Sequence, residues 1–296
     1  MTDQPPAGVR GVFHQLGPVL TAAVMFTVSD VFAKLALQGG TDVLSLLSFR
    51  SILGIGLVFV WLRLGEPAVA LSRNTKWISL ALGVLLTANL FSLFKAIELI
   101  PVSIAILTYF IYPLLTGIIG AITGIDRLTV TGAATALVAF FGLGLIIGAS
   151  PADLAVMGLL AAVAGAFCRA GMLLITRATL KGADARLVTW YTLWSSMLVF
   201  VALSMLSWNW HWPHGISAWV AFVGIGFTTT AAIFALYVST PRIGPFRTAL
   251  FMNLEPLMTA VLSAAVLGDR MTPLQVLGGV VMIAALCFFQ LRRPHR

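Results

Sequence analysis

Residues 253–272 read NLEPLMTAVLSAAVLGDRMT, an apolar stretch that contains a carboxylate, a proline and a short charged turn. At a constant offset of 143 residues, the difference between Pro256 and Pro113, it aligns without gaps with FIYPLLTGIIGAITGIDRLT at residues 110–129. The shared positions are Pro113 and Pro256, Thr116 and Thr259, Asp126 and Asp269, Arg127 and Arg270, and Thr129 and Thr272. An ungapped match at one offset indicates an internal repeat.

The composition is that of a membrane protein. Of the 296 residues, 59% are hydrophobic and 9% are charged, and the mean hydropathy is +1.01. A soluble domain has about 25% charged residues, so this chain lacks the polar surface that water requires. Apolar runs of about 20 residues, each long enough to cross a bilayer, follow one another along the chain. We therefore expect an all-α polytopic membrane protein.

The charged residues and the cysteines argue against several other classes. The formal net charge of +8 is better explained by cytoplasmic loops than by nucleic acid, because positive residues of membrane proteins gather there. Cys168 and Cys287 lie in apolar stretches far apart in sequence, so neither a disulfide nor a metal site is expected. No zinc-protease, hydrolase or phosphate-loop motif is present. We expect no cofactor, and we keep a membrane-embedded enzyme or scaffold only as a minor alternative.

Hydropathy divides the chain into ten predicted spans. They cover about residues 16–37, 43–62, 76–97, 101–123, 129–148, 153–176, 186–206, 216–239, 245–267 and 273–291. With both termini inside, 13 of the 18 lysines and arginines lie in cytoplasmic segments, and only Arg270 lies in an outer loop. Because lysine and arginine concentrate on the cytoplasmic side, the sequence predicts that both termini are cytoplasmic.

The repeat extends over both halves of the chain. The offset of 143 also aligns the third span with the eighth, and an offset of about 139 to 141 aligns the first two spans with the sixth and seventh. Each half, residues 1–148 and 149–296, then holds five spans. Because five is odd, the second half enters the membrane from the opposite side. The sequence therefore predicts two inverted five-helix repeats, an architecture that lets one site open to either face.

These features resemble one known family. Two five-helix halves, each closing with a proline-bearing helix, a G-D/E-R-L/M-T turn and a glycine-containing last helix, are similar to the drug/metabolite transporter superfamily, EamA type. The matching residues are Pro256, Gly268, Asp269, Arg270, Thr272, Gln275 and Gly279, with a weaker copy at Pro113, Asp126, Arg127 and Gly132. The first copy departs at Ile125, where the family's turn glycine would fall. The length and layout are also similar to the YddG-type amino-acid exporters.

The resemblance implies a secondary transporter of the bacterial inner membrane. Such a protein exports small metabolites, with amino acids as the expected substrate class, by alternating access through a central cavity. A passive channel or facilitator is the alternative. The implied partners are a small-molecule substrate and the lipid bilayer, with no nucleic acid, in a monomer or a homodimer.

Four ionisable side chains inside predicted spans are candidate substrate-binding residues, because charges at this depth are costly. Counting residues from the span ends places Asp30 and Arg50 at one level and Arg169 and Glu255 at another. Each pair is either a structural ion pair or a substrate site. In the second case Glu255 binds an ammonium group or a coupling proton, and an arginine binds a carboxylate.

Pro113 and Pro256 interrupt their predicted helices at matching positions. Each removes a backbone hydrogen bond and frees the carbonyl four residues earlier. The result is either a simple kink or a gating element that lines a cavity. Nearby polar and aromatic side chains extend the candidate cavity lining: Asn89, Tyr109, Tyr112, Thr229, Tyr237 and Asn253, with Trp190 and Tyr191 as an apolar wall.

Overall fold

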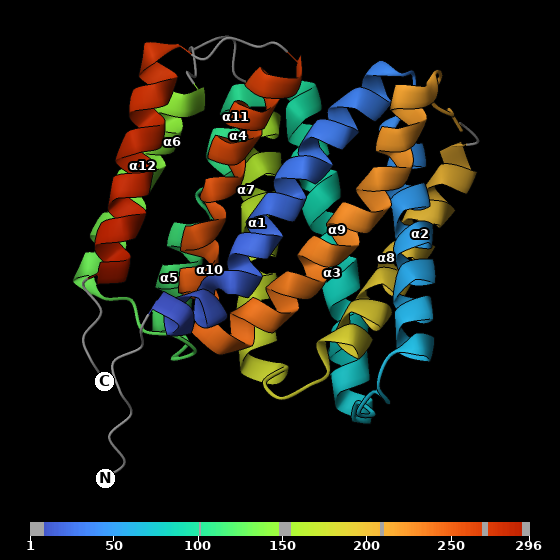
Figure 1. Ribbon diagram of the computed structural model, residues 1–296, viewed down its shortest axis with the longest axis horizontal. Helices are drawn as coiled ribbons and strands as arrows, with labels where there is room; N and C mark the ends of the chain where they lie inside the picture. The colour runs from blue at the N-terminus through green and yellow to red at the C-terminus, as the bar shows by residue number, and fades with distance from the viewer. Residues whose placement is uncertain (1–8, 101, 148–154, 208–209, 268–271, 292–296) are drawn as a thin grey trace.

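The computed structural model describes residues 9–100, 102–147, 155–207, 210–267 and 272–291. In these ranges all regular secondary structure is α-helical, and no strand occurs (Figure 1). Two members of the predicted charged turn, Asp269 and Arg270, lie outside the described residues.

Twelve helices follow one another in this described part of the chain. They are α1 (Val9–Gln38), α2 (Val43–Leu64), α3 (Arg73–Leu99), α4 (Val102–Tyr109), α5 (Tyr112–Ile122), α6 (Val130–Ile147), α7 (Val156–Thr179), α8 (Ala185–Ser207), α9 (Ile216–Ile243), α10 (Pro245–Met252), α11 (Leu254–Leu267) and α12 (Pro273–Leu291).

The helices form one bundle with two ends (Figure 1). We call the end where α1 begins the Val9 end, and the end where α1 finishes the Gly40 end. Helix α12 finishes at the Val9 end, so the first and last helices have their outer termini on the same side. Hydrogen bonds join turns at each end. At the Gly40 end, His214 donates its backbone N–H to the Gly39 carbonyl at 2.7 Å. At the Val9 end, the Arg186 guanidinium donates to the Glu66 backbone carbonyl at 2.9 Å.

Side-chain caps explain where several helices begin. The Asp42 carboxylate accepts hydrogen bonds from the N–H groups of Leu44 and Ser45 at 3.0 and 3.1 Å, which satisfies two free donors of α2. Ser72 caps α3 in the same way through the Thr75 N–H. Burial raises the pKa of Asp42, but the hydrogen bonds from Ser45 and from other backbone N–H groups outweigh it, so this pKa lies below its ordinary value.

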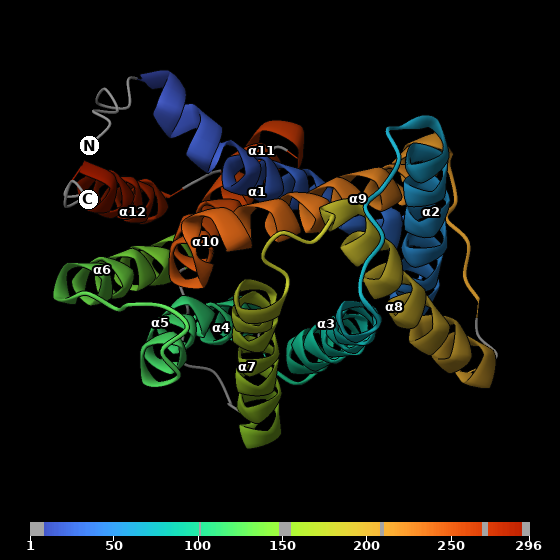
Figure 2. The same cartoon turned by 90° about the horizontal axis from the view of Figure 1, so that it is seen from below.

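Close helix contacts build the bundle (Figure 2). Helix α1 packs on α9, α3 on α7, α2 on α8, and α6 on α12. Small residues allow these approaches: a Cβ on Gly83 of α3 would lie 2.1 Å from the Thr192 carbonyl oxygen of α8, so no larger residue fits without a shift. Helices α1 and α2 hardly touch, although a short turn joins them, because each packs against α9.

The outer surface of the bundle is apolar. Large apolar side chains such as Phe141, Leu206 and Ile216 are 63%, 83% and 85% exposed. By length and apolar composition, seven helical segments of the described chain can cross a membrane, and the apolar helices α6 and α12 are somewhat shorter. One of the seven segments, Ile104–Ile122, runs through the break between α4 and α5.

Candidate functional site

Two helices break near the middle of the bundle, and the breaks lie directly before prolines. The chain turns after Tyr109, and α5 begins with Pro113 in its first turn. The second break falls at Asn253, between α10 and α11, with Pro256 in the first turn of α11. Proline lacks an N–H and clashes with the preceding turn, which explains both interruptions. A gating role of the two prolines stays a prediction.

Arg169 of α7 lies beside these breaks and is 6% exposed. The guanidinium lies over the ring of Phe26 at 5.2 Å and over the ring of Tyr112 at 5.8 Å. Aromatic contacts of this kind hold a guanidinium by its planar faces and leave its N–H edge available. The Arg169 Nε atom is buried and has no hydrogen-bond partner in the described part of the chain. This side chain is therefore held in position but incompletely satisfied.

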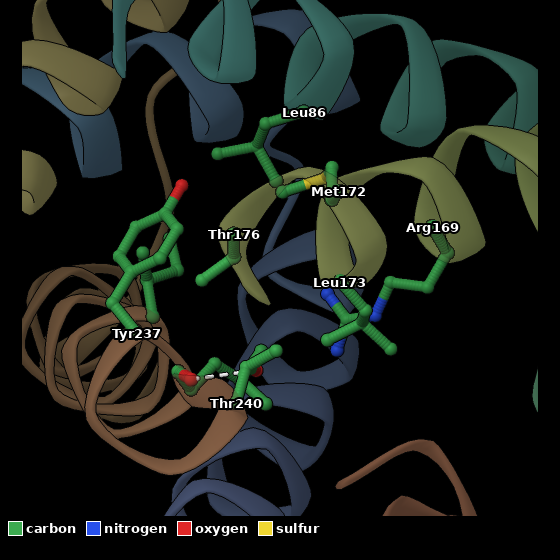
Figure 3. A pocket seen from close by; sticks show the side chains of 9 residues that line it. Leu86, Arg169, Met172, Leu173, Thr176, Tyr237 and Thr240 are labelled. Carbon is green, nitrogen blue, oxygen red and sulfur yellow. Dashed lines mark hydrogen bonds between the residues drawn. The ribbon is translucent and has the colours of Figure 1, made fainter. Parts of the chain in front are cut away.

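Arg169 also lines a cavity of about 20 Å³ between α7 and α9, a volume that holds about one water molecule (Figure 3). Apolar side chains form most of the wall, and Thr176, Tyr237 and Thr240 add hydroxyl groups. The Tyr237 hydroxyl is hydrogen-bonded to Thr192 of α8 at 3.0 Å. The guanidinium of Arg169 points toward this cavity.

Glu255 and Asp30 form the acidic side of the site. Glu255 lies within electrostatic range of both Arg169 and Asp30, yet no ion pair joins it to Arg169 among the described residues. Asp30 of α1 accepts a hydrogen bond from the Thr259 hydroxyl of α11 at 3.1 Å. The Thr27 hydroxyl, one turn before Asp30, donates to the Glu255 backbone carbonyl at 3.3 Å. These contacts hold α1 against the first turns of α11.

Asn89 and Tyr109 support the site from α3 and α4. The Asn89 amide donates to the Tyr109 hydroxyl at 3.2 Å and to the Gly165 carbonyl at 2.8 Å. Gly165 precedes Arg169 by one helical turn, so Asn89 ties the Arg169 segment of α7 to α3. Asn89 and Tyr109 are 2% and 7% exposed, which makes this a buried, satisfied network.

A further polar atom at the breaks, the Asn253 Oδ1, is buried without a partner in the described chain, and the Tyr112 hydroxyl lies beside the Arg169 guanidinium. Tyr112 and Asn253 are 1% and 2% exposed. A buried polar atom without a partner costs about 1–3 kcal/mol, so the Asn253 Oδ1 and the Arg169 Nε call for an explanation. A polar ligand is one explanation.

The expected Asp30–Arg50 pair is not present in the described structure. Asp30 accepts a hydrogen bond from Thr259, whereas Arg50 is 9% exposed and makes no hydrogen bond or ion pair with the described residues. The reason is the path of α9: α1 and α2 both pack on it and therefore present different faces to the protein interior. The Arg169–Glu255 juxtaposition is present, as two charges in one region and not as a contact ion pair.

The two aromatic residues of the expected apolar wall lie on α8, and their role as a wall stays a prediction. Trp190 packs against Phe59 of α2 at 6.1 Å, and the Lys76 ammonium lies 5.9 Å from the Tyr191 ring. Both aromatic side chains thus contact α2 or α3, and they also pack against the buried cluster that contains Met172 and Tyr237. Thr229 is buried, with its hydroxyl bonded to the Ile225 carbonyl of the preceding turn.

Sequence reasoning missed Phe26, Thr27 and Thr259 as members of the site. Phe26 gave no signal, because one phenylalanine among many apolar residues carries no pattern. Thr259 did give one, since it matches Thr116 in the repeat, but a hydroxyl inside a helix usually bonds to its own backbone, as Thr116 does to the Tyr112 carbonyl at 2.7 Å.

These features define a class of protein: a helical membrane protein with broken helices and ionisable groups at mid-bundle, where transporters hold their substrates. The sequence profile of the EamA-like transporter family matches residues 17–148 and 156–290. The chain belongs to the EamA-like transporter family and is a multi-pass membrane protein.

Two individual proteins are similar to this chain. The chain is 26% identical over 257 residues to the "Uncharacterized transporter YxxF" of Bacillus subtilis (strain 168), covering 81% of this chain and 78% of that protein. A solved crystal structure superposes with a TM-score of 0.81 at 19% identity, covering 95% of this chain and 99% of the other. That likeness concerns the fold alone.

Proposed function

We propose that the protein is a secondary transporter that exports amino acids across the bacterial inner membrane by alternating access. The observation that supports this proposal is that the mid-bundle site contains both a cationic and an acidic part. On one side stands Arg169, with an unpartnered Nε and with the Tyr112 hydroxyl beside it. On the other side stand the carboxyl groups of Glu255 and Asp30. A zwitterion supplies a carboxylate for the first side and an ammonium for the second.

The proposed architecture is ten spans in two inverted halves, residues 1–148 and 149–296. Helix packing supports it, because the contact of α1 with α9 corresponds to that of α7 with α3, and the contact of α2 with α9 to that of α8 with α3. The family profile matching in two separate ranges also supports it. Rocking of the halves about their two-fold axis would then expose the site to each face in turn.

The proposed orientation has the Val9 end, with both termini, in the cytoplasm. Basic residues at that end support this, among them Arg63, Lys76, Arg127, Arg177 and Arg242. The YddG-type subgroup is proposed on length and layout only. We propose a monomer or a homodimer in the bilayer.

The test is counterflow in liposomes that contain the purified protein. Liposomes loaded with unlabelled threonine, methionine or phenylalanine should accumulate the labelled amino acid from outside, with a rate that saturates. Empty liposomes are the control. Folded, monodisperse protein that moves none of a broad amino-acid panel would contradict the proposed substrate class. A flux that rises linearly with concentration, without counterflow, would favour the channel alternative.

A further inference from the structure

We propose that Phe246 and Asp126 form a clasp that keeps the Val9 end of the substrate path closed. The clasp consists of Phe246 of α10, Asp126 of the α5–α6 turn, and two glycines, Gly117 and Gly132. This inference rests on the proposed transport function, because it assigns the gate of the same path.

The first element of the clasp is a helix cap supplied from another part of the chain. Asp126 accepts a hydrogen bond from the Phe246 N–H at 3.2 Å through its Oδ2. This N–H is one of the free donors at the start of α10, where the helix dipole also favours a negative charge. The other carboxylate oxygen accepts the Arg127 N–H at 2.9 Å, and the Asp126 N–H donates to the Gly120 carbonyl at 3.1 Å. The carboxylate is thus oriented toward α10 by its own turn.

Gly244 shows how closely the turn and α10 approach. Its φ of +91° lies in the left-handed region, which side chains rarely adopt. A Cβ at this position would also lie 2.9 Å from the Asp126 Oδ2. The backbone geometry and the packing therefore both require glycine at the start of α10.

The second element is a slot for an aromatic ring. Phe246 is 3% exposed. A Cβ on Gly117 of α5 would lie 2.8 Å from its ring, and a Cβ on Gly132 of α6 would lie 2.9 Å from it. Phe289 of α12 meets the ring edge-on at 6.1 Å between centroids. Glycines of two helices leave the space that the ring fills, and Figure 2 shows α10 beside α5 and α6 at this end.

The two ends of the bundle differ in packing. At the Val9 end α10 packs on α5 and α7. The corresponding pairs at the Gly40 end, α4 with α11 and α4 with α1, make no comparable contact among the described residues. An alternating-access transporter closes one end at a time, so the structure is closed at the Val9 end by the segment that the clasp holds.

The repeat shows that the ring and its slot occur in one half only. At the offset of 143, Phe246 corresponds to Ser103, Gly117 to Ala260, and Gly132 to Gln275. The Gly40 end therefore lacks the residues for an equivalent slot. Since the two closed states are otherwise related by symmetry, the clasp biases the conformational equilibrium toward closure at the Val9 end.

The experiment measures access to Thr240, which is fully buried and lines the cavity between α7 and α9. Cys168 and Cys287 are first replaced by alanine, and Thr240→Cys serves as the reporter in nanodiscs, where a hydrophilic thiol reagent reaches both faces. Phe246→Ala and Asp126→Asn should each raise the labelling rate about tenfold or more, as expected for a shifted population. Phe141→Ala, a surface-exposed phenylalanine of α6, is the matched control and should leave the rate unchanged.

A second reporter separates gate opening from general loosening. Ser48→Cys lies on α2, is fully buried and contacts Ser204 of α8, remote from the clasp. Its labelling should not change in the clasp variants. Should Phe246→Ala fail to fold, Gly132→Ala tests the same slot with one added methyl group. Unchanged Thr240→Cys labelling in every folded clasp variant would overturn the proposal, and so would an equal rise at both reporters. The assay needs no substrate, so its outcome is independent of the amino-acid panel.

Discussion

Arg169→Lys tests the proposed carboxylate contact most directly. The substitution keeps a positive charge near Glu255 but removes the planar group that lies over Phe26 and Tyr112. A lysine ammonium reaches a substrate carboxylate as a single point, whereas a guanidinium donates two parallel hydrogen bonds. The loss of one charged hydrogen bond costs about 1.5–3 kcal/mol. The apparent affinity for an amino acid should therefore fall by about 10- to 150-fold.

The assay is counterflow of labelled phenylalanine over a range of concentrations, with KM and maximal rate fitted separately. The matched control is Arg50→Lys, because Arg50 is also a buried arginine and forms no hydrogen bond or ion pair with the site among the described residues. Its KM should stay within about twofold of the parent value, well below the cost of a lost charged hydrogen bond. The amide of phenylalanine, which lacks the carboxylate, should bind the parent protein weakly and should bind Arg169→Lys no worse. A KM for Arg169→Lys within about threefold of the parent, in folded protein, would refute the carboxylate contact.

Three further predictions follow from the site, the orientation and the helix caps. Glu255→Gln should make the transport rate independent of pH if Glu255 exchanges a proton, and an unchanged pH profile would leave it a structural residue. In a protein without Cys168 and Cys287, Ile216→Cys, at an 85% exposed position of the Gly40 end, should react with an impermeant thiol reagent added outside intact cells; reaction only after lysis would reverse the orientation. Asp42→Ala should lower stability at neutral pH by about 1 kcal/mol, seen as a lower thermal midpoint in detergent. Because the pKa of Asp42 lies below its ordinary value of 3.8, this contribution is present above that pH and is lost as the pH falls through the lowered pKa, so the two midpoints should converge in acid.

Depth along a helix could be read from the sequence, but the direction of a side chain around the helix could not. Counting residues placed Arg169 and Glu255 at one level, and the structure brings them into one region. The same counting placed Asp30 beside Arg50, yet the structure turns Asp30 to Thr259. The direction in which a helix face points depends on the helices packed against it. The long contact of α1 with α9 is such a case, because no local sequence pattern predicts this packing.

The helix breaks were predictable because a proline acts through its own chemistry, wherever the helix packs. The packing partners of Trp190 and Tyr191 on α8 were not predictable, because an aromatic side chain packs equally well against any apolar neighbour. Their partners, Phe59 and Lys76, lie on helices that meet α8 at the Val9 end. The packing partners of aromatic residues can thus be assigned only from the tertiary structure. Charged residues and prolines, in contrast, limit the possible helix arrangements at the level of the sequence.

The dipolar character of the proposed site follows from divergence between the two proposed halves. Tyr112 and Glu255 are equivalent at the offset of 143, and Asp30 and Arg169 are equivalent at an offset of 139. In a fully symmetric pair of halves the two ends of the site would carry the same charge and would suit a symmetric ligand. Here Glu255 lies within electrostatic range of both Asp30 and Arg169, and the Arg169 guanidinium lies over the Tyr112 ring, so the proposed site combines carboxyl groups that accept hydrogen bonds with a guanidinium that donates them. Two substitutions in one ancestral repeat would be enough to turn a symmetric cavity into one that distinguishes an ammonium from a carboxylate. If the halves rock about their common axis, the site still opens to each face of the membrane in turn.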